Sequence, residues 1–113
     1  MHEYSVIQAV LARVETEARA HNAHGVRAIA VSVGALSGVD PGLLETAYGL
    51  CRGEGLCADA TLEICFIPAL WQCRECHTAV APSGTLRCQS CATPAQLVSG
   101  DELLLERIDM EVR

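Results

Sequence analysis

The chain has 113 residues, half of them hydrophobic, and a formal net charge of -6. This length suits one compact domain with room for a small appended module. The acidic balance argues against nucleic-acid binding, because phosphate recognition requires clustered Lys and Arg. No segment approaches the roughly 20 apolar residues of a membrane span, and no signal segment is visible. We therefore expect a cytoplasmic protein that has neither a membrane nor a nucleic acid as partner.

The first part of the chain predicts a helix followed by a strand. Residues 4–22 place apolar side chains at helical spacing along one face: Ile7, Val10, Leu11, Val14 and Ala18. Gly25 is expected to end this helix. Residues 26–36 predict a strand with at least one buried face, because β-branched side chains alternate with small ones from Ile29 to Val33.

A second helix and two further strands follow. Asp40 is a good N-cap for this helix, and Pro41 fits its first position. Residues 60–68 alternate like a strand. Residues 102–112 form the last predicted strand, and their alternation places Leu104 on the same face as Ile108.

The order of elements predicts the fold class. The elements run α-β-α-β, then a cysteine-rich segment, then β. This order favours an α+β fold, in which a small three-stranded sheet with two helices carries an inserted module. We expect residues 1–70 and 94–113 to form one discontinuous domain and residues 71–93 to form a zinc-binding ribbon domain.

Four of the seven cysteines form two pairs. Cys73-x-x-Cys76 is followed after eleven residues by Cys88-x-x-Cys91. In a reducing compartment, such spacing favours metal binding over disulfide bonds. Two facing pairs supply four thiolates at tetrahedral corners, which Zn(II) prefers in closed structural sites. We expect a zinc ribbon that folds around its ion, because so short a segment has few core side chains.

The spacing leaves other chemistry open. A rubredoxin-like iron site uses the same four sulfurs and is redox active. The run from Cys73 to His77 also matches a c-type haem attachment pattern, although that reading leaves the second pair unexplained. Outside the quartet, Cys51 and Cys65 are expected to be buried free thiols.

The chain has three histidines besides His2. His21 and His24 border a helix end and should be solvated. His77 directly follows a cysteine of the first pair, so a substitute ligand for the metal, or a link between this site and a second metal site, is an alternative for it.

The first residues suggest a second metal site. A histidine near a terminus is usually a solvated side chain. Here a retained Met1 amine, the following backbone nitrogens and the His2 ring can reach one metal in a plane. Planar nitrogen sets suit Ni(II) or Cu(II). We expect Met1 to be retained because His2 is too large to permit its removal, and we expect the helix from Tyr4 onward to leave these residues free.

Together these motifs are recognisable. The sequence resembles the HypA/HybF family of hydrogenase-maturation nickel metallochaperones. The resemblance rests on the Met1-His2-Glu3 start, on the cysteine quartet and on the order of elements, and it covers essentially the whole chain. The segment VGALSGVDPGLLETAY also looks like the strand-to-helix segment of this family.

The resemblance implies a concrete function. One Ni(II) would bind through the His2 ring and nearby nitrogens of Met1 and the backbone, with Glu3 contributing chiefly its amide. Zn(II) would be the structural ion of the quartet. The protein would not be an enzyme. It would deliver nickel to the large-subunit precursor of NiFe-hydrogenase together with a HypB-type GTPase, and in some members to urease maturation proteins. From the residues alone, a rubredoxin-like electron carrier and a zinc-ribbon protein-interaction module stay open.

Overall fold

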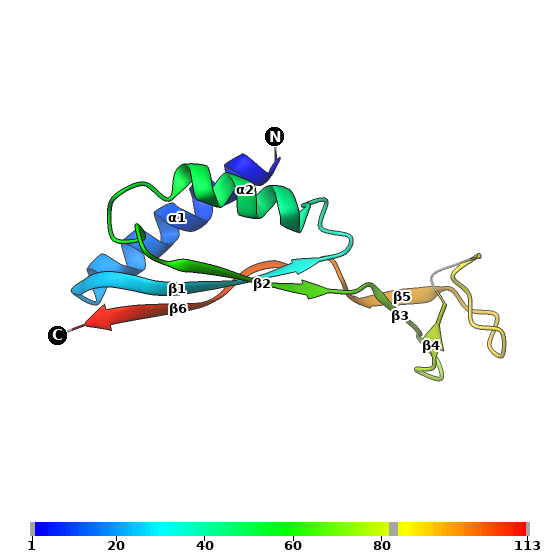
Figure 1. Cartoon of the computed structure of the whole chain (residues 1–113). Coiled ribbons are helices and arrows are strands. Elements are labelled where there is room, and N and C mark those ends of the chain that lie inside the picture. Colours follow the sequence, from blue (N-terminus) through cyan, green and yellow to red (C-terminus); the bar gives the residue numbers. More distant parts are fainter. Residues whose placement is uncertain (1, 82–83, 113) are drawn as a thin grey trace.

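The computed structural model describes residues 2–81 and 84–112. Its elements, in chain order, are α1 (His2–Ala20), β1 (Ala23–Gly34), α2 (Pro41–Cys51), β2 (Thr61–Ile67), β3 (Leu70–Cys73), β4 (Ala79–Val80), β5 (Ala95–Ser99) and β6 (Leu103–Val112). Both helices cover one face of a sheet with strand order β2-β1-β6, and a second sheet of order β4-β3-β5 extends from one end (Figure 1). This confirms the α+β prediction. In the described residues, no helix is long and apolar enough to cross a membrane.

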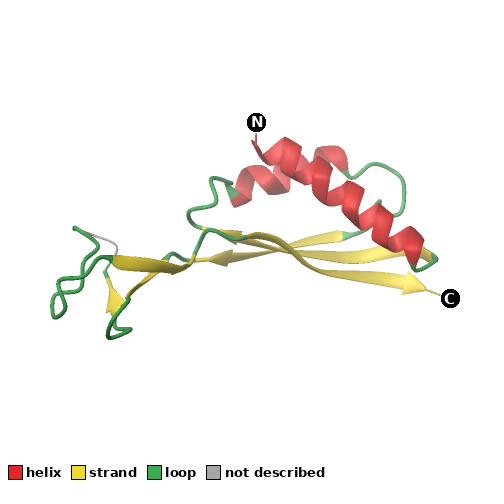
Figure 2. Cartoon of the chain, turned by 180° about the vertical axis from the view of Figure 1, so that it is seen from behind, coloured by secondary structure: helices red, strands yellow, loops and turns green. Residues whose placement is uncertain are grey.

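The two helices and the larger sheet form what we call the body, residues 2–67 and 103–112. Its core lies between the helices and the sheet (Figure 2). The central strand β1 pairs with β2 in parallel and with β6 antiparallel. Its side chains Ile29, Val31 and Val33 are almost completely buried, as the alternation predicted.

The ends of α1 differ from the prediction. The helix begins at His2 rather than at Tyr4, so the expectation of free first residues is wrong for His2 and Glu3. Glu3 favours this start because a carboxylate in the first turn faces the positive end of the helix dipole. At the other end, Asn22 rather than Gly25 adopts the left-handed conformation, with φ 57°. Asn tolerates this conformation at a helix C-terminus, and the strand therefore begins before Gly25.

The start of α2 is as predicted. The Asp40 carboxylate accepts a hydrogen bond of 3.1 Å from the Leu43 N–H, and Pro41 occupies the first turn. Tyr48 lies on the buried face of the helix, and its hydroxyl donates a 2.6 Å hydrogen bond to the Ala60 carbonyl. This bond ties α2 to the chain that enters β2.

The last strand, β6, contains a bulge. Its register against β1 shifts between Ala30 and Val31, so Glu106 is an extra residue on the β6 side. As a result Leu105 packs against the core, whereas Leu104 is 52% exposed. The prediction that Leu104 shares a face with Ile108 is wrong, because simple alternation does not count the extra residue.

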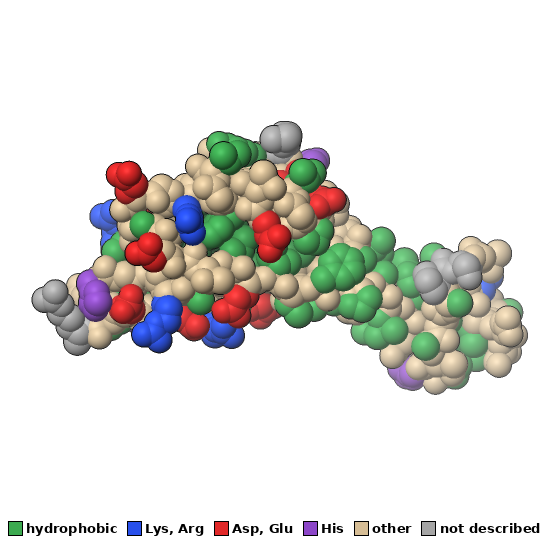
Figure 3. Space-filling view, viewed as in Figure 1, with side chains coloured by type: hydrophobic (Ala, Val, Ile, Leu, Met, Phe, Trp, Pro, Cys, Tyr) green, Lys and Arg blue, Asp and Glu red, His purple; other side chains and the backbone are tan. Residues whose placement is uncertain are grey.

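The second sheet and its loops, residues 70–81 and 84–99, form what we call the cysteine module. Two short links, 68–69 and 100–102, join it to the body, and apolar side chains cover this neck (Figure 3). The N–H of Leu36 donates a 2.6 Å hydrogen bond to the Gly100 carbonyl. A Cβ on Gly34 would overlap this carbonyl, so the contact requires glycine.

The second sheet crosses the predicted domain boundary between residues 93 and 94, because β3 and β4 lie before it and β5 lies after it. Strand β5 pairs with β3 from Ala95 to Ser99. Residues 95–99 are therefore paired within the cysteine module, and the chain returns to the body at β6.

Candidate metal centre

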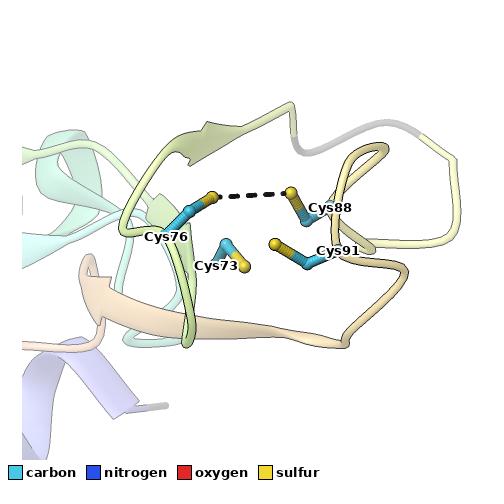
Figure 4. Close-up of side chains that lie close together, drawn as sticks. All are labelled: Cys73, Cys76, Cys88 and Cys91. Atoms are coloured by element: carbon cyan, nitrogen blue, oxygen red, sulfur yellow. Dashed lines mark hydrogen bonds between the residues drawn. The ribbon is translucent and has the colours of Figure 1, made fainter.

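The four paired cysteines converge in the cysteine module (Figure 4). Cys73 ends β3 and Cys76 lies in the turn that follows, while Cys88 and Cys91 belong to a second turn before β5. The four sulfurs all lie within 4.8 Å of one another. The sulfurs of Cys76 and Cys88 are 3.7 Å apart. The fold thus gathers all four residues that the spacing singled out.

The two turns have the same local structure. In the first, the His77 N–H donates a 3.1 Å hydrogen bond to the Cys73 carbonyl, and in the second the Ala92 N–H donates one of 2.9 Å to the Cys88 carbonyl. His77 and Ala92 both adopt positive φ angles, 61° and 54°. This conformation favours glycine, so each turn keeps a non-glycine residue in an uncommon backbone state. The repeated geometry aims the sulfurs of both turns at one point.

The sulfur geometry fits a tetrahedral ion. Zn–S bonds of about 2.3 Å place neighbouring sulfurs of a tetrahedron about 3.8 Å apart, close to the separation of Cys76 and Cys88. A disulfide bond, at about 2.05 Å, is far shorter. Four thiolates also fill the coordination shell, as structural sites require. The module can therefore bind a metal but leaves no coordination position open for catalysis.

The four sulfurs differ in their electrostatic surroundings. The pKa of Cys73 is lowered to about 6, first by the Cys76 N–H and then by the Thr93 hydroxyl, which both hydrogen-bond to its sulfur. Hydrogen bonds with Thr78 lower the pKa of Cys76. The sulfurs of Cys73 and Cys76 instead raise the pKa of Cys91 to about 12. A metal that binds all four sulfurs must therefore displace protons.

Two threonines near the sulfurs were not among the expected site residues. The Thr93 hydroxyl lies 3.4 Å from the sulfur of Cys73, and the Thr78 hydroxyl lies 3.1 Å from that of Cys76. The sequence contains a signal for them, since each pair extends to Cys-x-x-Cys-x-Thr. This repeat identifies both threonines by position.

Of the residues predicted to bind nickel, His2 and Glu3 belong to the first turn of α1, which lies on the body and away from the cysteine module (Figure 1). Met1 lies outside the described residues. His2 is exposed in the first turn of α1. The Glu3 residue is only 9% exposed, and its carboxylate accepts a 3.1 Å hydrogen bond from the Asp40 N–H. This hydrogen bond is the main reason why the pKa of Glu3 lies below its usual value.

The remaining cysteines and histidines divide between the surface and the core. Cys65 is exposed, so the expectation of a buried thiol is wrong for it. It pairs with Ser32 on the sheet face that the helices do not cover, which alternation within β2 cannot reveal. Cys57 is buried, and Cys51 is partly buried. His21 and His24 are exposed, as expected, and His77 is exposed as well.

The fold and the site define a small α+β metal-binding protein in which a four-cysteine site stands apart from an exposed histidine at a helix start. The family model described as "Hydrogenase/urease nickel incorporation, metallochaperone, hypA" matches residues 1–110. The chain belongs to this HypA family of hydrogenase and urease maturation metallochaperones. The resemblance noted from the motifs is thereby confirmed.

Individual relatives agree with the family model. The chain is 36% identical over 114 residues to the hydrogenase maturation factor HypA of Wolinella succinogenes. This match covers 98% of this chain and 96% of the relative. It is 35% identical over 115 residues to HypA of Aquifex aeolicus, with 99% of each chain covered.

Solved structures agree as well. The solution structure of the Ni metallochaperone HypA from Helicobacter pylori has a TM-score of 0.68 and 28% identity, over 98% of each chain. A second solution structure of a HypA protein has a TM-score of 0.76 and 28% identity, over 100% of this chain and 98% of the other.

Proposed function

We propose that this chain binds Ni(II) at the start of α1 and delivers it, in the cytoplasm, to the large-subunit precursor of NiFe-hydrogenase. The observation that carries this proposal is the position of the helix start. Because α1 begins at His2, the amide groups of His2 and Glu3 belong to the first turn. The first N–H groups of a helix have no acceptor within it. A metal can therefore replace their protons without breaking a helical hydrogen bond.

The contacts of the first turn support this ligand set. The Met1 amine, the amides of His2 and Glu3 and the His2 ring would supply four nitrogens, and planar nitrogen sets suit Ni(II). The Glu3 carboxylate is already held by the Asp40 N–H, which leaves Glu3 to contribute its amide. This contact also anchors the start of α1 on the body while the His2 ring stays exposed.

We further propose that Zn(II) is the resident ion of the cysteine module. Cys73, Cys76, Cys88 and Cys91 would hold it, and the bound ion would cross-link the two turns. The sulfur separations and the all-thiolate set support this assignment. A rubredoxin-like iron carrier is the second candidate, because iron takes the same four sulfurs. Elemental analysis separates the two, and an iron protein would be red.

A carrier of nickel needs partners rather than catalytic groups. We propose a HypB-type GTPase and the hydrogenase large-subunit precursor as partners, with urease maturation proteins as further clients. The family description names both hydrogenase and urease. On this proposal the protein is not an enzyme.

Nickel calorimetry on untagged protein tests the proposal. We expect His2→Ala, and likewise an N-terminal extension that blocks the amine, to abolish nickel binding while zinc content and helicity stay unchanged. His21→Ala is the matched control, because His21 is also exposed but lies just beyond the other end of α1. Unchanged nickel binding by His2→Ala would overturn the proposed site.

A further inference from the structure

The first pair of sulfurs in the cysteine module has hydrogen-bond partners outside the four cysteines. The sulfur of Cys73 lies 3.4 Å from the Thr93 hydroxyl and 3.4 Å from the Glu75 amide nitrogen. The Cys76 thiol donates a 3.1 Å hydrogen bond to the Thr78 hydroxyl oxygen, and once a bound metal has displaced the thiol proton, the hydroxyl is the group that can donate to the sulfur. Each sulfur of this pair thus has a threonine hydroxyl within hydrogen-bond reach.

The second pair lacks such partners among residues 2–81 and 84–112. There, the sulfurs of Cys88 and Cys91 hydrogen-bond only with other cysteines, as in the 3.7 Å contact between Cys88 and Cys76 (Figure 4). Although the two turns repeat the same sequence pattern, both threonines serve the first pair: Thr93 reaches across to Cys73, while Thr78 bonds within its own turn. The cluster is therefore asymmetric in its donors.

This asymmetry affects reactivity, because the thiolate is the nucleophilic form of cysteine. A hydroxyl that donates to a thiolate makes a charge-assisted hydrogen bond, which stabilises the negative charge on sulfur. A thiolate without such a donor is less stabilised and is therefore the stronger nucleophile. Cys76 and Cys91 make a fair comparison, since both are exposed while Cys73 and Cys88 are buried.

We propose that Thr78 and Thr93 are positioning residues that protect one side of the metal-loaded cluster, so that electrophiles attack it first at Cys91. The inference rests on the proposed function only in taking Zn(II) as the bound ion. With a maleimide, a lone pair of the Cys91 sulfur forms a bond to an alkene carbon, and the Zn–S bond breaks. The π electrons move to the neighbouring carbon, which takes a proton from water. The coordination shell would thus open at one defined corner.

Time-resolved peptide mapping of the zinc-loaded full chain with N-ethylmaleimide tests this order. We expect Cys91 to react about tenfold faster than Cys76. A rate ratio of this size corresponds to part of the stabilisation that one hydrogen bond gives to a charged group. Thr78→Val replaces the hydroxyl by a methyl group and should raise the Cys76 rate severalfold. Thr78→Ser keeps the hydroxyl, so its Cys76 rate should equal that of the native chain. Thr85→Val, at an exposed position of the same module, is the matched control and should change neither rate.

Two further readouts separate this role from simple packing. Thr78→Val and Thr93→Val should each weaken zinc binding about tenfold in chelator competition, as the loss of a ligand's hydrogen-bond partner does. In the cobalt-substituted protein, both should move the sulfur-to-metal charge-transfer band to lower energy, and Thr85→Val should not.

The possible failures are distinguishable. Equal reaction rates of Cys76 and Cys91 in the zinc-loaded native chain would overturn the inference. This test uses the native chain alone, so it does not depend on whether the variants fold. An unchanged Cys76 rate in a zinc-loaded Thr78→Val chain would also overturn the inference. Elemental analysis before labelling keeps the proposed function separate, because a native chain that binds no zinc contradicts the proposed ion itself.

Discussion

The body and the cysteine module differ in what holds them together. The body encloses an apolar core between its helices and its sheet, with Ile7, Ile29 and Leu44 fully buried. In the described part of the chain from Leu70 to Ser99, the buried side chains are cysteines, Cys73 and Cys88. Hydrophobic burial therefore stabilises the body, whereas on the proposed function a bound ion would supply most of the stability of the module. The two parts should respond to different perturbations.

The largest effect is expected from Cys73→Ala. Removing a ligand should forfeit much of a metal-binding free energy that reaches about 10 kcal/mol in small zinc sites. We expect β3, β4 and β5 to lose amide protection in hydrogen exchange, while α1 and β1 keep theirs. Chelation of the metal from the native chain should have the same effect.

Cys65→Ala is the matched control for this experiment. Cys65 is an exposed cysteine of the body outside the quartet, so its removal should change neither metal content nor exchange. If Cys73→Ala unfolded the body together with the module, the two parts would be one cooperative unit and the comparison would fail.

A core substitution in the body should give the converse result. Leu44 is fully buried, so Leu44→Ala should lower the free energy of unfolding by about 2–5 kcal/mol through lost burial and a residual cavity. Leu50 lies on the same helix but is 71% exposed, and Leu50→Ala should cost less than about 0.5 kcal/mol. Denaturant unfolding of the helices measures both. The metal content of the module should stay the same in each variant, and its loss in Leu44→Ala would show coupling between the parts.

The smallest effect, and the one that depends on pH, concerns Glu3. Its pKa in the folded state lies below the usual value of 4.5, because the Asp40 N–H stabilises the carboxylate. This group therefore stabilises the fold above about pH 4.5, and the contribution is lost as the pH falls through the lower, folded-state pKa. Glu3→Gln should lower the melting temperature of the helices at neutral pH, and the difference from the native chain should shrink on acidification.

Glu45→Gln provides the control, since Glu45 is an exposed carboxylate on α2. Its substitution should leave the melting temperature nearly unchanged at every pH. A difference between Glu3→Gln and the native chain that persists undiminished in acid would show that the Asp40 contact does not depend on the charge of Glu3.

Local patterns were sufficient to predict much of this structure. The spacing from Ile7 to Ala18 identifies the buried face of α1, because helical periodicity is a property of neighbouring turns. Asp40 and Pro41 mark the start of α2 for a similarly local reason. The two cysteine pairs were also visible, since a Cys-x-x-Cys turn needs only four consecutive residues.

Other features depend on contacts between distant segments. The bulge at Glu106 arises from pairing with β1, and it decides that Leu105 rather than Leu104 faces the core. The exposure of Cys65 depends on which sheet face the helices leave uncovered. Neither can be obtained from alternation within one strand.

The sequence by itself determined the element types of the body and the four sulfurs of the candidate metal site. Each of these follows from residue type and short spacing. The tertiary structure alone decided that the Glu3 carboxylate meets the Asp40 N–H and that Thr93 reaches the sulfur of Cys73. Those partners are 37 and 20 residues apart in the chain, and only folding brings such distant groups within hydrogen-bond reach.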